Sequence, residues 1–307
     1  MNSRIPKTGA RRGSPMLVVG LTGDVGAGKS TVSSIWASAG AKVLDADAIV
    51  AELWRSEELV SAAVGRWGKS ILGPSGYPDH AAISELVFEN DEEYRWICDT
   101  VHPVARRELY RRVQELSGWV VVEIPLLFEN GVPDWIDFTV YVEAPEIVRI
   151  SRNATRGWDA REVHRRQERL MTTEKKRHMA DVLLVNDGSL HNLSEKAMAL
   201  ARRFIDASSI TGFFVGSSDM RKALCLKDGL SVCEEVIDLE PCSDKNGFLA
   251  WVLAGDLEMV LDVLRARCPG DEFTMETCEE IGKPPKRVLL KVTGGRTYED
   301  NNDSHRG

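Results

Sequence analysis

The glycine-rich motif G-x-x-x-x-G-K-S at residues 23–30 constrains the fold of this chain more than any other feature of its sequence. It follows a short apolar, β-branched run at residues 17–21 and opens a segment, residues 30–40, whose apolar side chains recur at helical spacing. A strand, a glycine loop and a helix in this order form a phosphate site, because the loop turns its backbone N–H groups inward and the helix adds its positive N-terminal end. We therefore expect Lys29 to bind the β- and γ-phosphates of a nucleoside triphosphate and Ser30 to bind Mg²⁺. A glycine-rich turn without a ligand would not need Lys and Ser together at the start of a helix.

The alternation of strands and helices continues through the first 204 residues. Because parallel neighbours need crossover connections, it predicts an α/β fold of the P-loop type, with a parallel five-stranded sheet flanked by helices. The predicted strands are residues 17–21, 41–44, 119–124, 138–142 and 181–185. The predicted helices are residues 30–40, 48–54, 81–116 with a break near His102 and Pro103, 146–177 with a turn around Gly157, and 193–204.

Ligands of such sheets bind beyond the carboxyl ends of the strands, where the acids Asp45 and Asp47 follow the second predicted strand. A carboxylate repels a transferred phosphate, so it is justified there if it orients or deprotonates the accepting hydroxyl or helps to hold Mg²⁺. Asp after a strand is also a common helix N-cap, so capping of the next helix is the alternative for either residue. The same rule adds the segments 23–30, 125–129 and 186–188 to the site.

Residues 149–177 are strongly basic, with ten Lys and Arg against four acids. Arg152 and Arg156 are four residues apart and share one helical face. Because phosphoryl transfer depends on positioning and on neutralising charge, a basic helical hairpin is suited to close over a triphosphate as a lid. For single members such as Arg161 and Lys175, a solvated helical surface explains the charge equally well.

Seven short motifs follow one another along this part of the chain. They are G-L-T-G-D-V-G-A-G-K-S-T at residues 20–31, D-A-D at 45–47, H-P at 102–103, I-P-L-L-F-E at 124–129, the pair Arg152 and Arg156, A-D at 180–181, and N-D-G at 186–188. Their order and spacing resemble those of the dephospho-CoA kinase family over about residues 16–204. Many nucleotide-binding enzymes share the phosphate loop, whereas D-A-D together with I-P-L-L-F-E is far more specific.

The resemblance implies transfer of the γ-phosphoryl group of ATP, with Mg²⁺, to the ribose 3′-hydroxyl of dephospho-CoA, the last step of coenzyme A biosynthesis. It implies that Asp47 accepts or orients the hydroxyl proton, that Lys29 and Arg152 are also catalytic, and that Asn186 lies near the adenine of ATP. The residues implied for ATP binding are Gly26, Ala27, Gly28, Lys29, Ser30, Thr31, Arg156 and Asn186, with Ser30 also at the metal. Those implied for the acceptor are Asp47, His102, Pro125, Leu126, Leu127 and Glu129.

Three features depart from the family pattern. The family usually has a second glycine where Asp24 stands and a glutamine where Leu170 stands, and one residue is missing in the turn beside Gly157. We expect the Asp24 carboxylate to point outwards to solvent, since it would repel phosphates. Taken from the residues alone, His102 is closer to a satisfied histidine at a helix end, so its acceptor role rests on the resemblance.

The last third of the chain differs in composition and lies beyond the resemblance. Residues 205–307 carry 12 Lys and Arg against 19 Asp and Glu, which argues against non-specific nucleic-acid binding. Five of the six cysteines lie here, but their spacing matches no zinc template. Helical spacing at residues 247–268 and strand-like alternation at 287–293 predict a small α+β domain. We interpret it as a packing or interaction appendage, since a second enzyme or a sensor has no motif behind it.

The predicted organisation is a disordered basic tail at residues 1–15, a kinase domain at 16–204 with its lid at about 149–177, a small domain at 205–297 and a disordered tail at 298–307. Without a secretory signal or a long apolar run, we expect a cytoplasmic protein with no membrane partner. Two other functions stay open. One is a kinase for another nucleoside or nucleotide, and the other is a regulatory protein that binds nucleotide without transferring phosphate. The regulatory protein is disfavoured by the presence of Lys29, Ser30, Asp47 and Arg152. A protein released from catalysis has little physical reason to hold unpaired charges together.

Overall fold

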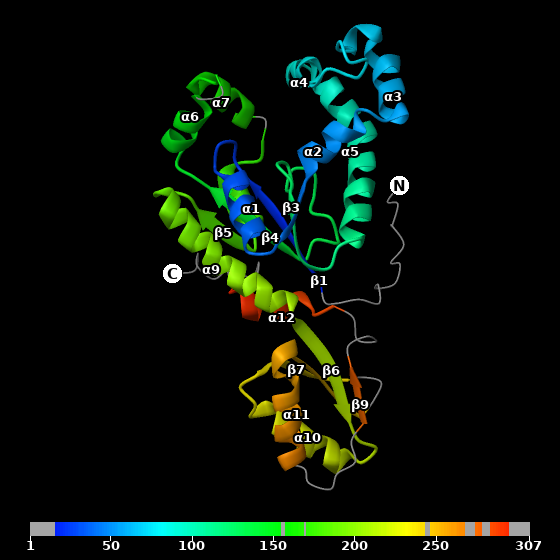
Figure 1. Cartoon of the computed structure of the whole chain (residues 1–307), viewed down its shortest axis with the longest axis vertical. Coiled ribbons are helices and arrows are strands. Elements are labelled where there is room, and N and C mark those ends of the chain that lie inside the picture. Colours follow the sequence, from blue (N-terminus) through cyan, green and yellow to red (C-terminus); the bar gives the residue numbers. More distant parts are fainter. Residues whose placement is uncertain are drawn as a thin grey trace.

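The computed structural model describes residues 16–154, 157–168, 170–242, 246–267, 274–277 and 283–294. The tails predicted at residues 1–15 and 298–307 lie outside these ranges. A parallel sheet with its helices occupies the upper part of the molecule, and an antiparallel sheet with its own helices lies below it (Figure 1). Within the described ranges, none of the helices combines the length and the apolar content that crossing a bilayer requires.

The upper sheet confirms the predicted architecture. Its strands run in the order β2-β3-β1-β4-β5, and every neighbouring pair is parallel. Alternate residues of β1 pack on opposite faces of the sheet. Leu17 and Val19 belong to one core cluster, and Val18 belongs to another. The strands are β1 (Met16–Gly23), β2 (Lys42–Asp45), β3 (Gly118–Glu123), β4 (Phe138–Glu143) and β5 (Val182–Val185).

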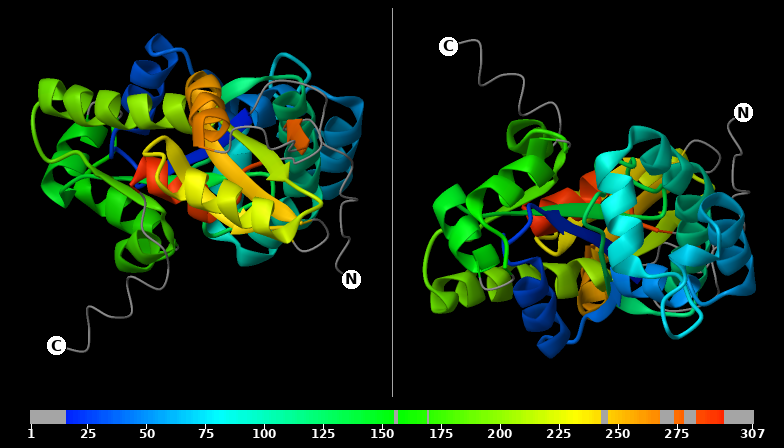
Figure 2. Two further views of the ribbon diagram at one scale, coloured as in Figure 1. Left: turned by 90° about the horizontal axis from the view of Figure 1, so that it is seen from below. Right: turned by 90° about the horizontal axis from the view of Figure 1, so that it is seen from above.

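Helices cover both faces of this sheet (Figure 2). They are α1 (Lys29–Ser38) and α9 (Leu190–Ser208) on one face and α2 (Ala46–Leu53) and α5 (Asp91–Gln114) on the other. Trp36 of α1 donates its indole N–H to the Ala197 carbonyl of α9 at 2.9 Å, which fixes these two helices to each other. Leu109 and Val113 of α5 share a core cluster with Val18 of β1. The sheet is therefore the middle of three layers, which leaves its carboxyl edge open for a site.

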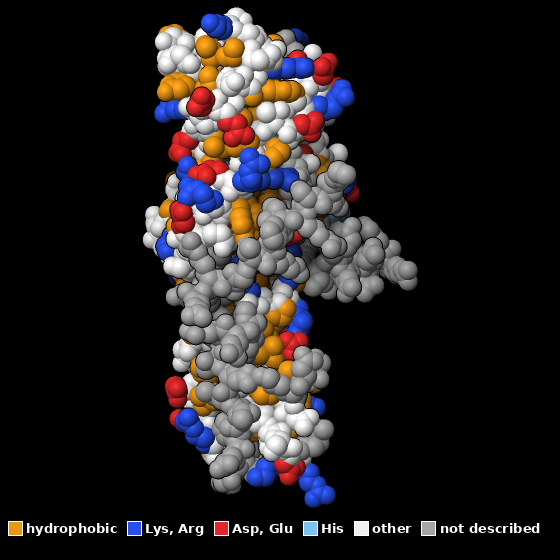
Figure 3. Space-filling model, turned by 90° about the vertical axis from the view of Figure 1, so that its right-hand side faces the viewer, with side chains coloured by type: hydrophobic (Ala, Val, Ile, Leu, Met, Phe, Trp, Pro, Cys, Tyr) orange, Lys and Arg blue, Asp and Glu red, His pale blue; other side chains and the backbone are white. Residues whose placement is uncertain are grey.

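Helices α3 (Glu57–Trp67) and α4 (His80–Glu89), joined by the short helix η1 (Lys69–Ile71), pack beside the first half of α5. They enclose a small separate core that includes Trp54, Leu59 and Val101. On the surface seen from the α5 side, acidic and basic side chains are interspersed, and neither sign dominates (Figure 3). These helices lie above the parallel sheet, on the side of α2 and α5 (Figure 1).

The helix break predicted at His102 and Pro103 is wrong. Helix α5 runs without interruption through both residues, and the break lies at Asn90. The Asn90 side chain accepts a hydrogen bond from the Glu92 N–H at 2.8 Å and so caps α5. Pro103 removes one backbone hydrogen bond, but packing of residues such as Val101, which is 1% exposed, keeps the helix intact.

The basic segment forms three short helices, of which α6 and α7 lie above the sheet on the side opposite α3 and α4 (Figure 1). They are α6 (Glu146–Ala154), α7 (Ala160–Glu168) and α8 (Thr173–Met179). The turn predicted around Gly157 is confirmed, since Gly157 has a φ of 78°, a conformation that favours glycine. We refer to α6 and α7 as the lid helices.

The lower unit is an antiparallel sheet in the order β7-β8-β6-β9. Helices α10 and α11 share a core cluster with this sheet through residues such as Leu226 and Leu264. The strands are β6 (Ile210–Gly216), β7 (Val236–Pro241), β8 (Gly247–Leu253) and β9 (Thr274–Thr277), and the helices are α10 (Met220–Ser231), η2 (Ala254–Asp256), α11 (Leu257–Arg267) and α12 (Lys286–Thr293). The predicted α+β class is thus correct.

Two of the element assignments in this unit are wrong. The segment predicted as one helix at residues 247–268 begins with strand β8, whose residues are apolar toward both faces. Ala250 belongs to the lower core, whereas Trp251 belongs to the core of the parallel sheet, so β8 shows no alternation in its sequence. The segment predicted as a strand at 287–293 is helix α12, because tertiary packing of Leu289 outweighs the local pattern.

Helix α12 joins the two units. Val288 and Leu289 belong to the same apolar cluster as Trp36 and Phe204 of the upper unit. Polar contacts surround this packing, since Lys286 Nζ lies 2.7 Å from a carboxylate oxygen of Asp181 at the start of β5. The core of the upper unit therefore includes residues from the end of the chain.

Candidate active site

The phosphate loop connects β1 to α1 and depends on glycine at two positions. Gly26 has a φ of 77° and Gly28 a φ of 104°. A Cβ atom on Gly26 would lie 2.6 Å from the Nδ2 atom of Asn153, and one on Gly28 would lie 2.6 Å from the Nδ2 atom of Asn186. The loop is closed by a hydrogen bond from the Ala27 N–H to the Asp24 carbonyl at 3.1 Å. Thr31 follows in the first turn of α1.

Lys29 lies across its own loop. Its Nζ atom donates to the carbonyls of Gly23 at 2.9 Å and Asp24 at 3.3 Å. Burial lowers the pKa of the Lys29 ammonium, while the carboxylates of Glu123, Asp24 and Asp47 oppose that shift. A cation with few fixed partners in a partly buried loop is well placed to turn toward a phosphate.

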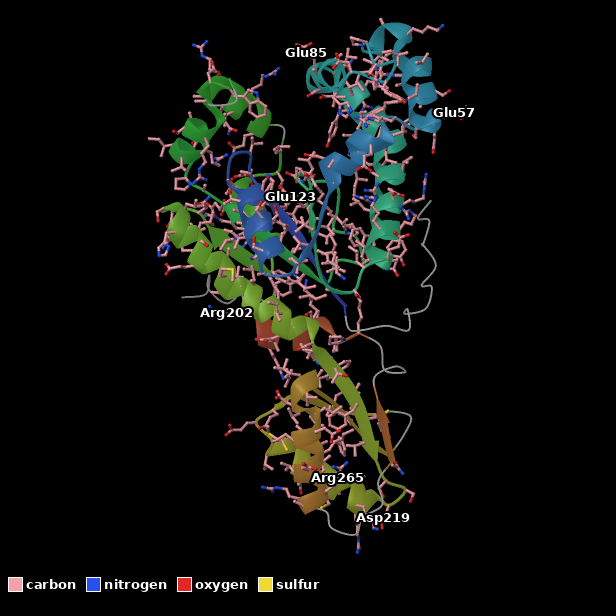
Figure 4. All side chains as sticks on the ribbon, viewed as in Figure 1. Glu57, Glu85, Glu123, Arg202, Asp219 and Arg265 are labelled. Atoms are coloured by element: carbon pink, nitrogen blue, oxygen red, sulfur yellow. The ribbon has the colours of Figure 1, made fainter. Side chains whose placement is uncertain are left out.

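Glu123, the last residue of β3, is a site residue that the sequence analysis missed. It is 7% exposed, and its two carboxylate oxygens accept hydrogen bonds from Ser30 Oγ at 3.2 Å and Ser33 Oγ at 3.0 Å. It lies near α1 in the middle of the upper unit (Figure 4). The signal was an acid that ends an otherwise apolar strand, buried from Trp119 onward, at the carboxyl edge of the sheet.

The structure separates the two acids of the D-A-D motif. Asp45 is the N-cap of α2, since its Oδ1 accepts from the N–H groups of Asp47 at 2.8 Å and Ala48 at 3.2 Å. Asp47 does not cap the helix, and its side chain lines a pocket beside the phosphate loop. Burial raises the pKa of Asp47, the Asp45 carboxylate raises it further, and Lys29 opposes the shift. Asp47 and Lys29 are therefore close enough to influence each other.

The pocket beside Asp47 has a volume of about 120 Å³ and lies between α2, α5 and the segment after β3. Predicted acceptor residues meet there, because His102, Pro125, Leu126 and Leu127 all contribute to its lining. Burial and the nearby Arg106 guanidinium lower the pKa of His102, which favours a neutral imidazole at pH 7. Glu129 lies outside the lining of this pocket.

Asp24 contradicts the expectation that its carboxylate points to solvent. It is 3% exposed, and its Oδ2 atom accepts from Thr173 Oγ1 at 3.1 Å while Lys176 Nζ lies 3.4 Å from its Oδ1 atom. Arg149 NH1 lies 3.8 Å from the same carboxylate. The Asp24 carboxylate is therefore buried, and cations of α6 and α8 together with a hydroxyl of α8 are its partners.

Arg152 and Asn186 lie against the loop. Arg152 NH1 donates to the Gly26 carbonyl at 3.2 Å, and its NH2 atom donates to Asn186 Oδ1 at 3.3 Å. Asn186 in turn donates from Nδ2 to the Ala27 carbonyl at 2.8 Å and is 2% exposed. The structure brings these predicted residues together at the loop, whereas Arg156 lies outside the described residues.

Taken together, a parallel sheet in the order 2-3-1-4-5, a phosphate loop after β1, lid helices and a pocket that contains an acid define a P-loop small-molecule kinase. The family model for dephospho-CoA kinase matches residues 17–192, which is more than half of the chain. The chain therefore belongs to the dephospho-CoA kinase family. The matched residues end within α9, so the lower unit lies beyond the family model.

Two relatives agree with this assignment, and one solved structure is similar in fold and sequence. The chain is 31% identical over 194 residues to dephospho-CoA kinase of Shewanella oneidensis, a match that covers 62% of this chain and 95% of the relative. It is 35% identical over 192 residues to dephospho-CoA kinase of Methylococcus capsulatus, which covers 62% and 97%. The crystal structure of TT1252 from Thermus thermophilus is similar with a TM-score of 0.54 and 35% identity, which covers 61% of this chain and 96% of that one.

Proposed function

We propose that this chain transfers the γ-phosphoryl group of ATP to the ribose 3′-hydroxyl of dephospho-CoA, which gives coenzyme A and ADP. The observation that carries the proposal is that the pocket lined by Asp47 adjoins the phosphate loop of Lys29. Thr22, just before the loop, donates from Oγ1 to the carbonyl of Pro125 in the pocket lining at 3.0 Å. A donor phosphate and an acceptor hydroxyl need such neighbouring sites. Membership of the dephospho-CoA kinase family supports the choice of acceptor.

On the donor side, the loop amides and Lys29 bind the phosphates of ATP. Lys29 gives up its hydrogen bonds to Gly23 and Asp24 to do so. Arg152, already held at the Gly26 carbonyl, adds positive charge where the transferred group becomes most anionic. Asn186 donates a hydrogen bond to the Ala27 carbonyl and so holds the phosphate loop in shape. We propose that it contributes to nucleotide binding partly in this way.

On the acceptor side, Asp47 orients the hydroxyl and takes up its proton. The carboxylate is free for this task because Asp45 alone caps α2. The apolar wall of the pocket, which includes Pro125 and Leu127, excludes water around the accepting group. His102, as a neutral imidazole, is a hydrogen-bond donor or acceptor for the rest of the acceptor molecule.

The residues around the loop fit a magnesium ion bound together with the phosphates of ATP. Ser30 Oγ and the Glu123 carboxylate offer the hard oxygen atoms that Mg²⁺ prefers. No cluster of three His, Cys, Asp or Glu side chains with metal-binding geometry occurs among the described residues, which suits an ion that takes most of its ligands from substrate and water. When bound, Mg²⁺ neutralises phosphate charge. Ser33 fixes the orientation of Glu123 for this role.

The proposal extends to domain organisation and location. We place the boundary of the kinase domain near residue 204, which is supported by the end of α9 at Ser208 and the start of the second sheet at Ile210. None of the cysteines in the described ranges forms a disulfide, which is compatible with a reducing compartment, and we propose a cytoplasmic protein. A fluorescent fusion that localised outside the cytoplasm would overturn this part. The proposed substrate is a small molecule, without a nucleic-acid or membrane partner.

The experiment that tests the function measures ADP release from Mg-ATP by the purified protein. Four conditions are compared: dephospho-CoA, AMP, adenosine and no acceptor. We expect turnover that depends on dephospho-CoA and disappears in Lys29→Ala, which controls for contaminating kinases. A preference for AMP or adenosine would indicate a different nucleotide kinase. ATP binding without acceptor-dependent turnover would indicate a regulatory protein.

A further inference from the structure

Four buried charges lie between the phosphate loop and the acceptor side of the site. They come from the loop (Asp24), from the segment after β3 (Glu129), from the lid helix α6 (Arg149) and from α8 (Lys176), and we call them the charge cluster. Their side chains are 3%, 10%, 6% and 3% exposed, respectively. Phe128, the residue before Glu129, belongs to a small buried apolar cluster. None of the four touches the pocket that contains Asp47.

Lys176 is the central member of the charge cluster. Its Nζ atom lies 2.8 Å from Glu129 Oε1 and 3.4 Å from Asp24 Oδ1, so one ammonium is shared by two acids more than a hundred residues apart. Glu129 Oε1 also accepts from the Met171 N–H at 3.3 Å. The other oxygen of Glu129 is buried without a hydrogen-bond partner among the described residues, so Lys176 is the main counter-charge of this acid.

Each acid anchors a different part of the site. Asp24 is the second residue of the phosphate loop, and its own carbonyl accepts from Lys29. Glu129 closes the segment Pro125 to Glu129, whose first three residues line the acceptor pocket. Thr22, just before the loop, donates from Oγ1 to the Pro125 carbonyl at 3.0 Å, which links the same two parts a second time.

Arg149 extends the charge cluster into the lid. Its Nε donates to the Ala144 carbonyl at 3.1 Å, and its NH1 donates to Gln167 Oε1 of α7 at 3.0 Å. The loop, the acceptor segment and both lid helices therefore meet at one group of buried charges. Burying several charges costs free energy of folding unless every charge is paired. Removal of one partner therefore destabilises the remaining buried charges.

We propose that Lys176 is a positioning residue that couples the phosphate loop to the acceptor segment, through Asp24 on one side and Glu129 on the other. Its ammonium sets the distance and orientation at which the donor phosphate and the acceptor pocket face each other. Glu129 then acts on the reaction through Lys176 rather than by contact with the acceptor. The catalytic consequence rests on the proposed function, whereas the coupling itself requires only that nucleotide binds the loop.

The coupling is tested by hydrogen–deuterium exchange with and without the non-hydrolysable analogue Mg-AMP-PNP. In the unmodified protein we expect the analogue to slow exchange both in the phosphate loop and in residues 126–131. In Lys176→Met the loop stays protected, whereas protection of residues 126–131 falls at least about threefold. Lys175→Met is the matched control, because this neighbouring lysine is exposed, and it retains both effects. Protection confined to the loop in the unmodified protein, or unchanged in Lys176→Met, overturns the proposal.

Steady-state kinetics with dephospho-CoA then measure the consequence for the reaction. We expect Lys176→Met to lower kcat about tenfold with less than threefold change in KM for either substrate, because positioning is lost rather than binding. If Lys176→Met does not fold, Glu129→Gln is the second variant. Its amide oxygen still faces Lys176, so we expect it to fold and to lower kcat by a smaller factor. A loss confined to KM for ATP, or equal to that of Lys175→Met, contradicts the proposal. Absence of turnover in the unmodified protein would refute the proposed function and leave the exchange experiment decisive.

Discussion

The two units of this molecule use charged side chains for different purposes. In the upper unit, Asp24, Lys176 and Glu123 are buried next to the phosphate loop, where charge is costly and chemistry takes place. In the lower unit, the main ionic contacts are those of Asp238 and Glu240 with Arg287 and Lys291, and the basic partners are about half exposed. The upper unit therefore uses buried charge for a site, and the lower unit uses partly solvated charge to hold a helix.

The same contrast separates what each unit contributes. The lower unit supplies none of the residues that line the pocket beside Asp47. It does supply Val288, Leu289 and Trp251 to the apolar core on which the parallel sheet rests. We infer that the upper unit carries the reaction and that the lower unit contributes to its stability. Four predictions can break or sharpen this division.

The largest expected effect is on turnover in the upper unit. Lys29→Ala removes the cation of the phosphate loop and is expected to lower kcat by about 10³-fold or more, because phosphoryl transfer depends on charge neutralisation. The thermal midpoint should stay within a few degrees, since the side chain makes only two hydrogen bonds to its own loop. Lys42→Ala, at an exposed lysine of β2, is the control and should leave kcat unchanged. Equal loss in both variants would contradict the role of Lys29.

The second prediction separates the two acids of the D-A-D motif. Asp47→Asn is expected to lower kcat on the order of 10²-fold with ATP affinity retained. Asp45→Asn should cost less than about threefold, since asparagine is an equally good N-cap. Because burial and Asp45 raise the pKa of Asp47, kcat/KM should fall in acid with a midpoint above the ordinary value of about 4. If the fall of kcat/KM in acid persists in Asp47→Asn, a group other than Asp47 causes it.

The third prediction concerns stability and comes from the lower unit. Leu289→Ala on α12, at a side chain 4% exposed, should lower the free energy of unfolding by about 2–5 kcal/mol, because it leaves a cavity in the shared core. At a temperature where the variant is folded, its kcat should stay within about twofold. Leu224→Ala, at a leucine of α10 that is 50% exposed, is the control and should change stability by less than about 0.5 kcal/mol. A folded Leu289→Ala protein without turnover would break the proposed division.

The smallest effect is expected at the charged edge of α12. Burial alone would raise the pKa of Asp238, but hydrogen bonds from Lys291 and Arg287 outweigh it and lower the pKa. A depressed folded-state pKa means stabilisation that is present above the unfolded value of about 4 and is lost as pH falls through the folded value. The thermal midpoint of Asp238→Asn should therefore lie below that of the unmodified protein at pH 7, and the difference should shrink below pH 4. Asp228→Asn, at an exposed acid of α10, should show no such trend.

Much of the upper unit could be predicted from the sequence because ligand binding limits the residues that can occupy it. The glycine loop and the acids at the ends of buried strands carry their signal within a few neighbouring residues. The order of the sheet and the pairing of Asp24 with Lys176 could not be predicted, since these two residues are 152 positions apart. In the lower unit, β8 is apolar on both faces, and such a run does not distinguish a strand from a buried helix.

The central claim is that ATP and an acceptor hydroxyl meet between Lys29 and Asp47. The most direct test is phosphorus NMR of the product formed from Mg-ATP and dephospho-CoA. The account predicts ADP together with one new phosphomonoester signal coupled to the proton on the ribose 3′ carbon, absent with Lys29→Ala. Release of the phosphoryl group as inorganic phosphate, or its appearance on a different hydroxyl, would contradict it.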